Sequence, residues 1–371
     1  MTYADLSSST ADAVAVLAER DPALPDLGLI LDPERLATAL GRDIAIERVR
    51  YKRGAAVVVA VRGEDDTRAW VAEYSDPAKL EKTEARARRA GHTVARVTPA
   101  ALTGTAEADR VLSPVLHRLS ESRAELLADA RVVRYNPHRR LVLRAGGLAV
   151  KVRDRDADLA DDVARSLAAS GHPVIAPVRL GDRVSATEWW GSGDLSTRHD
   201  PERERRAGGI LAALHAVDPS AFPVVPHPPV VGASRAAAAV AAVLPDLSAR
   251  ADRLALRIAE RLGGSASAVL LHGDWSLDQV LSDGRAVRII DLDRVTTGPA
   301  ERDLGSALAS GATTALLEGY AAAGGAVDES TLPAWTALSL LQRAIDPFRA
   351  LAAGWPSAVR DRLAQAEGGL S

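Results

Sequence analysis

Hydrophobic residues recur at helical spacing near the start of the chain and through much of its second half. Residues 10–19 carry apolar side chains three or four positions apart, and the same spacing returns over 313–351. Two further blocks, 202–217 and 233–261, are separated by a proline-rich turn at 222–229. Because this interval places side chains on one face of a helix, the pattern predicts helices near both ends and in the middle.

An internal repeat occupies much of the first half. Residues 44–97 and 131–180 each contain three short strand-like runs, then a helical run and another strand-like run. Residues 50–57 (RYKRGAAV) align with 134–141 (RYNPHRRL), and each octet spans a tight turn between two strands. The pattern predicts two tandem β-β-β-α-β units. The alternative is a chance similarity between β-hairpins.

The third predicted strands of the two units differ at one position that matters for chemistry. Lys151 stands in the middle of the second strand, 148–154, and Glu73 aligns with it in the first, 70–76. A carboxylate cannot make the phosphate contact of an ammonium group, so we expect the first unit to bind no nucleotide. We expect it to be a cap that packs on the second unit.

Composition and charge narrow the range of partners. The 371 residues include 46 Lys and Arg against 49 Asp and Glu, a formal net charge of −3, which gives no bulk attraction to nucleic acid or an anionic membrane. The absence of cysteine excludes disulfides, thiolate metal sites and cysteine nucleophiles. The longest apolar run, 236–244, is too short to cross a bilayer, and residues 1–20 lack the pattern of an export signal. We expect a cytoplasmic protein whose partners are small molecules, and the oligomeric state stays open.

The densest group of chemically informative residues lies within 269–304. A short apolar strand at its start leads directly into Asp274. A hairpin with Asp-Gly at its tip spans 280–290, so its two ends meet and bring Gln279 beside Asp291. Carboxylate and amide oxygens with room for water and phosphate suit a Mg²⁺–nucleotide site. A separate carboxylate at Asp274 could orient a substrate hydroxyl and take its proton during phosphoryl transfer.

The order of these residues resembles the aminoglycoside phosphotransferase and choline kinase-like family of small-molecule kinases. The resemblance rests on His272, Asp274 and Gln279, then 289–293, Gly298 and Asp303-Leu304. It extends upstream to Lys151, to 188–195 as an interlobe linker and to 211–215 as the first helix of the second lobe, and covers about 131–360.

The resemblance implies an α+β, bilobal protein-kinase-like fold. An antiparallel-sheet N-lobe at 126–190 would precede a mainly helical C-lobe at 191–371 that carries the catalytic loop. The additional N-terminal β-β-β-α-β unit would form a cap domain at 1–125.

The resemblance also implies roles for residues in the catalytic segment. Asp274 would be the catalytic base, and His272 would shape its loop. Asp291 would be the principal Mg²⁺ ligand with Gln279 beside it. The family usually has asparagine at the position of Gln279, and Asp278 is the alternative ligand.

On the N-lobe side, Lys151 would hold the α- and β-phosphates. A helix carboxylate would steady it, with Asp161 or Asp162 as the candidate where the family usually has glutamate. The segment that contains Glu188 and Trp190 would receive the adenine of ATP, or the guanine of GTP.

Each of these residues also has a purely structural interpretation. Asp274 could cap a loop, Asp291 could end a strand and Lys151 could be a solvated edge residue. For three pairs the choice stays open: Asp293-Arg294 contacts substrate or forms a surface pair, Arg139-Arg140 covers the phosphates or is merely exposed, and Trp189-Trp190 belongs to the core or forms a platform for the adenine. We expect an architectural role for Asp303 and no metal binding by His138, His199, His215 and His227.

The leading hypothesis is an ATP-dependent kinase, or a GTP-dependent one, that phosphorylates a hydroxyl of an aminosugar, an antibiotic or a similar polyol. The alternative is a kinase-shaped protein that binds nucleotide or another ligand with weak or no catalysis. A protein Ser/Thr kinase is less favoured, because only eleven residues separate Asp291 from Asp303. A hydrolase is also less favoured, because the sequence lacks the G-x-S-x-G motif that carries a nucleophilic serine.

Overall fold

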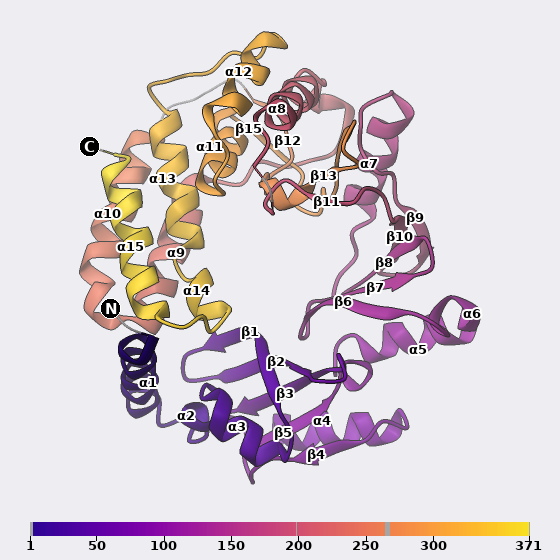
Figure 1. Ribbon diagram of the computed structural model, residues 1–371, viewed down its shortest axis with the longest axis vertical. Helices are drawn as coiled ribbons and strands as arrows, with labels where there is room; N and C mark the ends of the chain where they lie inside the picture. Colours follow the sequence, from indigo (N-terminus) through magenta and orange to yellow (C-terminus); the bar gives the residue numbers. More distant parts are fainter. Residues whose placement is uncertain (1–2, 198, 264–267, 371) are drawn as a thin grey trace.

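A computed structural model describes residues 3–197, 199–263 and 268–370 of the chain. The elements follow one another around a ring (Figure 1). The ring closes where the N-terminal helices pack beside the C-terminal ones. Among the described residues, no helix combines the length and apolarity that a membrane crossing requires.

The first sheet has five antiparallel strands in the order β1-β2-β3-β5-β4. Its strands are β1 (Ile44–Lys52), β2 (Ala56–Gly63), β3 (Arg68–Tyr74), β4 (Val94–Arg96) and β5 (Ala101–Thr105). Helix α4 (Pro77–Arg89) connects β3 to β4. It begins at Pro77 because Asp76 accepts a 3.0 Å hydrogen bond from the Ala78 amide and proline suits the first helical position.

The second sheet repeats the first. Its five antiparallel strands have the equivalent order β6-β7-β8-β10-β9. They are β6 (Arg131–Asn136), β7 (Arg140–Ala145), β8 (Leu148–Arg153), β9 (Val178–Gly181) and β10 (Val184–Glu188), with α7 (Asp158–Ala169) between β8 and β9. The predicted repeat is therefore confirmed, and each copy has a fifth strand that the sequence pattern did not assign.

The predicted alignment of the third strands is wrong by one residue. Val58 pairs with Ala72 in the first sheet, whereas Val142, which aligns with Val58, pairs with Lys151 in the second. Ala72 therefore occupies the place of Lys151. Glu73 lies on the opposite face of its strand, because successive side chains of a strand point to opposite faces.

Glu73 is fully buried on that opposite face. Its Oε1 accepts a 3.0 Å hydrogen bond from the Asp26 amide, at the start of α2 (Leu27–Ile30). Burial, together with the nearby Asp26 and Asp21, raises the pKa of Glu73 to about 7. The folded protein thus binds a proton here more tightly than the unfolded chain does.

This difference predicts a pH-dependent stability that Glu73→Gln removes. The folded-state pKa lies above the unfolded value, so the stabilisation is fully present below about pH 4.5 and is lost as the pH rises through 7. Between pH 5 and pH 8 the free energy of unfolding should fall by about 2 kcal/mol from this group alone. Denaturant unfolding at both pH values should show that loss in the unsubstituted chain and a smaller one in Glu73→Gln. Equal losses would contradict the assignment.

The two sheets share one hydrophobic core, to which α4 and residues 112–119 also contribute. The face of the first sheet that carries Trp70 and Ala72 shares one core with the face of the second that carries Leu141 and Val150. The first unit therefore packs on the second, as expected of a cap. Its face that corresponds to the Lys151 face is filled by this core, which supports the prediction that the first unit binds no nucleotide.

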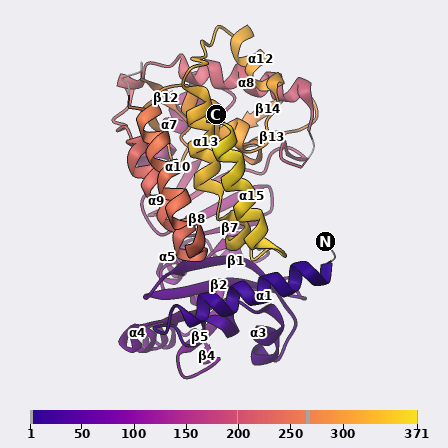
Figure 2. The same cartoon turned by 90° about the vertical axis from the view of Figure 1, so that its left-hand side faces the viewer.

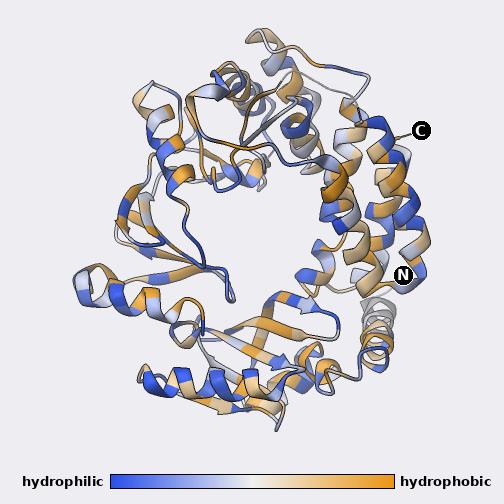
Figure 3. Ribbon diagram, turned by 180° about the vertical axis from the view of Figure 1, so that it is seen from behind, coloured by the Kyte–Doolittle hydropathy of each residue, from blue (hydrophilic) through white to orange (hydrophobic). Residues whose placement is uncertain are grey.

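The other face of the first sheet joins N-terminal and C-terminal helices in a common core. These helices are α1 (Tyr3–Glu19), α2 and α3 (Pro33–Leu40), together with α9 (Pro229–Val243), α10 (Ser248–Arg261), α13 (Leu332–Arg343) and α15 (Trp355–Gly368). Figure 2 shows the C-terminal helices standing on this sheet. Short helix α14 (Asp346–Arg349) links them to β1, where Phe348 packs edge-on between Tyr51 and Trp355. Along the C-terminal helices, hydrophobic residues are interspersed with hydrophilic ones, as expected for helices with one buried face (Figure 3).

A third core holds the predicted catalytic segment, 269–304. It is formed by α7, α8 (Pro201–His215), α11 (Glu301–Ala309) and α12 (Thr314–Ala322) with the strands β12 (Val269–Leu271), β13 (Val280–Ser282) and β14 (Val287–Ile289). Strand β11 (Gly193–Asp194) pairs with β13, and β15 (Thr296–Gly298) pairs with β12. The predicted hairpin is β13–β14. Helices α5 (Ser113–Ser122) and α6 (Ala124–Leu127) connect the two large sheets. The boundaries at 125 and 190 stay predictions.

Candidate active site

The loop that follows β12 is held by one buried carboxylate. Asp303 accepts hydrogen bonds from the His272 and Gly273 amides, at 2.7 and 3.0 Å. Burial alone would raise the pKa of Asp303, but the hydrogen bond and charge of His215 and the Gly273 amide lower it below its usual value. His272 Nε2 donates to the Ile290 carbonyl at 2.9 Å and ties the loop to the end of β14. The expected architectural role of Asp303 and the loop-shaping role of His272 are confirmed.

Gly273 is required where the loop passes Arg294. Its φ is +83°, in the left-handed region, and a Cβ there would lie 2.0 Å from the Arg294 carbonyl oxygen. Gly284, at the hairpin tip, has φ +97° but no described atom within 4 Å of a Cβ. Both glycines therefore adopt a left-handed backbone conformation that a side chain disfavours. Of the two, only Gly273 also lacks the space for a Cβ atom.

We expect Gly273→Ala to destabilise the chain far more than Gly284→Ala. The left-handed conformation costs both alanines about 1 kcal/mol, and the clash at Gly273 adds about 2 kcal/mol or more. Thermal unfolding of the two variants measures the difference. Equal shifts in Tm would mean that the loop does not pass Arg294 as closely as described.

Asp274 follows directly and is half exposed, with 42% of its side chain accessible. Arg294 Nε lies 3.6 Å from one carboxylate oxygen and Arg343 Nη2 lies 4.0 Å from the other. In the described part of the chain, the carboxylate accepts no hydrogen bond. The part of the side chain that is shielded from water still matters: this desolvation raises the pKa of Asp274 by more than the two arginines lower it. A carboxylate of raised basicity with accessible oxygens is suited to receive a proton.

Asp291 lies at the end of the hairpin, with φ +68°. The Ile290 amide donates to the Gln279 carbonyl at 3.0 Å, which places Gln279 and Asp291 at adjacent strand ends as predicted. Lys151 Nζ donates to Asp291 Oδ1 at 3.0 Å, and Arg140 Nη1 donates to Oδ2 at 2.8 Å. Burial would raise the pKa of Asp291, but the charges of Lys151 and Arg140 outweigh it and hold that pKa far below the usual range.

A second acid and a third cation extend this cluster. Arg153 donates to both oxygens of Asp293, at 3.0 and 3.3 Å, and to Asp161 at 3.3 Å. Arg140 and Lys151 lie 3.7 and 3.6 Å from Asp293. Arg153 is two residues after Lys151 on β8, so both project from one face of the sheet. That spacing was the available sequence signal for Arg153, which we did not predict.

The expected pairing of a helix acid with Lys151 is wrong. On α7, Asp161 bonds Arg153 and is 5% exposed. Asp162 is exposed and pairs with Arg165 and Arg179. Consecutive helix residues differ by about 100° around the axis, so only Asp161 faces the cluster. The structure does not bring Asp162 to Lys151.

The segment after β10 connects the second sheet to the hairpin β13–β14. The Trp189 amide donates to the Gly147 carbonyl at 2.8 Å, and β11 pairs with β13. The Arg288 guanidinium lies 4.7 Å from the Trp190 ring centroid and 3.7 Å from Glu188. This position matches that of an interlobe linker, and nucleotide-base contacts by Glu188 and Trp190 stay predictions.

The donor set at the loop fits magnesium in kind. Asp291 offers an ionised carboxylate and Gln279 an amide oxygen, which are hard oxygen ligands. Asp278, the alternative ligand, accepts a hydrogen bond from Ser276. Within residues 3–197, 199–263 and 268–370, no group of three or more His, Cys, Asp or Glu is arranged to hold a metal by itself. Such a site therefore needs phosphate oxygens and water to complete it.

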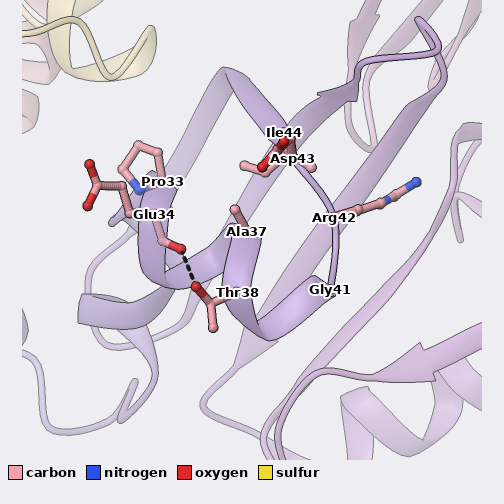
Figure 4. A pocket seen from close by; sticks show the side chains of 8 residues that line it. All are labelled: Pro33, Glu34, Ala37, Thr38, Gly41, Arg42, Asp43 and Ile44. Atoms are coloured by element: carbon pink, nitrogen blue, oxygen red, sulfur yellow. Dashed lines mark hydrogen bonds between the residues drawn. The ribbon is translucent and has the colours of Figure 1, made fainter.

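A hollow on the surface lies away from the predicted site residues. It has a volume of about 720 Å³ and lies between α3 and the start of β1, with none of the predicted site residues in its wall. Figure 4 shows its lining side chains: Pro33, Glu34, Ala37, Thr38, Gly41, Arg42, Asp43 and Ile44.

The antiparallel sheet and the helical lobe form a protein-kinase-like fold, and the family comparison places the chain among phosphotransferases. The sequence profile of the phosphotransferase enzyme family matches residues 121–341, more than half of the chain. The chain belongs to this family. Comparison with curated protein sequences gave no match.

Solved structures show the same fold at low sequence identity. A choline/ethanolamine kinase family protein from Mesorhizobium loti is 18% identical, with a TM-score of 0.52 over 70% of this chain and 94% of that one. Spectinomycin phosphotransferase APH(9)-Ia, in complex with ADP and spectinomycin, is 13% identical, with a TM-score of 0.51 over 69% and 93%. The GDP and kanamycin complex of APH(2")-IIia is 16% identical, with a TM-score of 0.50 over 68% and 99%.

Proposed function

We propose that the chain transfers the γ-phosphate of ATP, or of GTP, to a hydroxyl group of a small metabolite such as an aminosugar, an antibiotic or a similar polyol. The observation that carries the proposal is the meeting of Asp291 with Lys151 and Arg140. These residues come from the catalytic hairpin and from two neighbouring strands of the second sheet. The two cations can bind phosphate oxygens, and the ionised carboxylate can bind the metal ion that accompanies them.

Asp274 would act on the acceptor. Its carboxylate would accept a hydrogen bond from the acceptor hydroxyl, orient the oxygen toward the γ-phosphorus and take the proton as the new O–P bond forms. The bond between the γ-phosphorus and the bridging oxygen would break, and the nucleoside diphosphate would leave with the bridging oxygen. The raised pKa of Asp274 makes its carboxylate a better proton acceptor than an ordinary aspartate.

Asp291 and Gln279 would hold Mg²⁺, which would neutralise phosphate oxygens and the charge that develops on them. The low pKa of Asp291 keeps its carboxylate ionised at neutral pH, so binding a cation there requires no proton release. Lys151 and Arg140 would contact the phosphates from the sheet side, close to where they now contact Asp291.

Two of the fold relatives support this choice of ligands. Their structures contain ADP with spectinomycin and GDP with kanamycin, each a purine nucleotide beside a small antibiotic. The experiment that tests the proposal is a measurement of nucleoside diphosphate release with ATP or GTP, Mg²⁺ and a panel of aminosugars, aminoglycosides, nucleoside antibiotics and amino alcohols. We expect release that depends on both Mg²⁺ and one class of acceptor. Nucleotide binding that ignores Mg²⁺, or no binding at all, would contradict the proposal.

The second candidate is a kinase-shaped binding protein with weak catalysis. The observation that favours it is that both carboxylate oxygens of Asp291 are already bonded to cations, while the second metal ligand is Gln279 in place of asparagine. This protein would bind nucleotide without a requirement for Mg²⁺ and release no diphosphate above the buffer rate.

A further inference from the structure

The turn between β6 and β7 is tied to a buried aspartate from outside its own sheet. Asp109 is fully buried and its Oδ2 accepts hydrogen bonds from the Tyr135 hydroxyl, at 2.8 Å, and from the His138 amide, at 2.6 Å. Its Oδ1 accepts from the amides of Val111 and Leu112, at 2.8 and 3.1 Å. One carboxylate therefore joins the start of α5 to the turn.

The first unit contains the same arrangement. Asp21 Oδ2 accepts from the Tyr51 hydroxyl at 2.8 Å and from the Gly54 amide at 2.9 Å. Tyr51 and Gly54 align with Tyr135 and His138 in the repeat. The tie is thus duplicated, and the repeat extends upstream to these two aspartates.

The turn between β6 and β7 has more stabilising contacts than the turn between β1 and β2. Gly54 has φ +66° and His138 has φ +61°. Glycine adopts this conformation freely, but a side chain does not. The second turn also receives a hydrogen bond from Arg50 Nη1 to the Pro137 carbonyl, and the His138 ring stacks on Tyr74 at 6.4 Å between centroids. Arg50 and Tyr74 belong to the first sheet, so the cap holds the turn of the N-lobe in a conformation that its own residues disfavour.

Only the second turn reaches the candidate active site. It ends at Arg140, whose guanidinium bonds Asp291. The equivalent position in the first unit is Ala56, and the face around Ala56 and Ala72 belongs to the core that the two sheets share with α4 and α5. The tie at Asp109 therefore acts on the site, and the tie at Asp21 does not.

We propose that Asp109 is a positioning residue for the nucleotide: it fixes the turn at 136–140 so that Arg140 stays aimed at the phosphates. The proposal rests on the proposed function. Fixing the cationic group before the nucleotide arrives removes the entropic cost of ordering a mobile turn on binding. The N-terminal unit then contributes to nucleotide affinity without touching the nucleotide.

The repeat supplies a matched control for the test. A carboxamide has one oxygen, so Asp109→Asn cannot accept all four hydrogen bonds. Both hydrogen bonds of Asp21 go to Oδ2, so Asp21→Asn weakens them by removing the charge, at a place where no site is near. Titration calorimetry with Mg²⁺ and a non-hydrolysable ATP analogue should give a Kd about tenfold weaker for Asp109→Asn. Asp21→Asn should stay within about twofold of the unsubstituted chain, although both variants should lose thermal stability. In diphosphate release, Asp109→Asn should raise the KM for nucleotide much more than it changes kcat.

Three outcomes would overturn the inference. Equal affinities for Asp109→Asn and the unsubstituted chain would remove the positioning role and leave the proposed function intact. Equal weakening by Asp21→Asn would reduce the effect to general stability. If the unsubstituted chain did not bind Mg²⁺ and nucleotide, the proposed function and the positioning role would both fail. If Asp109→Asn does not fold, Tyr135→Phe with Tyr51→Phe as its control makes the same comparison by removing one donor from each tie.

Discussion

Replacing Asp274 with asparagine is expected to lower kcat by about 10³-fold and to leave nucleotide binding nearly unchanged. Asparagine has almost the same shape but cannot accept the proton of the acceptor hydroxyl. Asp274 has no described hydrogen bond to the loop that holds it, and its two ion pairs are 3.6 and 4.0 Å long. The substitution should therefore leave the loop in place.

Diphosphate release in the presence of the acceptor measures the effect, and calorimetry with Mg²⁺ and nucleotide measures the binding. Asp283→Asn is a suitable control, since Asp283 is an exposed aspartate at the tip of the hairpin β13–β14, which follows the loop of Asp274. It should retain the full rate. An Asp274→Asn variant with the rate of the unsubstituted chain would remove Asp274 from the mechanism.

Replacing Asp291 with asparagine should abolish the dependence of nucleotide binding on Mg²⁺ and reduce turnover by at least about 10²-fold. The neutral side chain loses the charge that attracts the metal and that now neutralises Lys151 and Arg140. With these cations released, metal-free nucleotide should bind at least as well as before. Asp291→Asn should therefore weaken the binding of Mg²⁺ and leave the binding of metal-free nucleotide unchanged or tighter.

Titration of nucleotide with and without Mg²⁺ separates these effects. Asp161→Asn is the matched control, because it removes one negative charge from the same cluster through Arg153 and leaves Asp291 in place. This variant should keep the Mg²⁺ dependence. If Asp291→Asn bound Mg²⁺ and nucleotide as tightly as the unsubstituted chain, the metal would have to lie elsewhere.

The catalytic hairpin could be predicted from the sequence because its geometry is local. An Asp-Gly turn fixes the strand register over a few residues, so Gln279 and Asp291 could be placed side by side without knowledge of the remaining chain. The loop geometry at Gly273 is equally local. The architectural role of Asp303 could be assigned only after the family resemblance had located the loop.

The error at Glu73 has a different cause. The turns before the third strands differ in length, so aligning their apolar residues left the register undetermined by one position. A slip of one residue moves every side chain to the other face of a sheet. Because of this slip, Glu73, a buried structural carboxylate, was aligned with Lys151. The pairing of Val58 with Ala72 settles the register.

Direct contacts between distant segments could not be predicted from residue spacing. Arg140 and Asp291 are 151 residues apart, and their meeting depends on how the second sheet docks on the helical lobe. The choice between Asp161 and Asp162 depends on the rotation of α7 about its axis, which is set by packing. The ties from Asp109 and Asp21 join each turn to a segment that carries no recognisable motif.

The most direct test of the account is a crystal structure of the chain with Mg²⁺ and a non-hydrolysable ATP analogue. We expect the metal between the Asp291 carboxylate and the Gln279 amide oxygen, the phosphates beside Lys151 and Arg140, and the base at residues 188–190. Asp274 should be free of metal, with its carboxylate facing the γ-phosphate. A nucleotide bound away from these residues, or a metal that does not contact Asp291, would contradict the proposed phosphotransfer site.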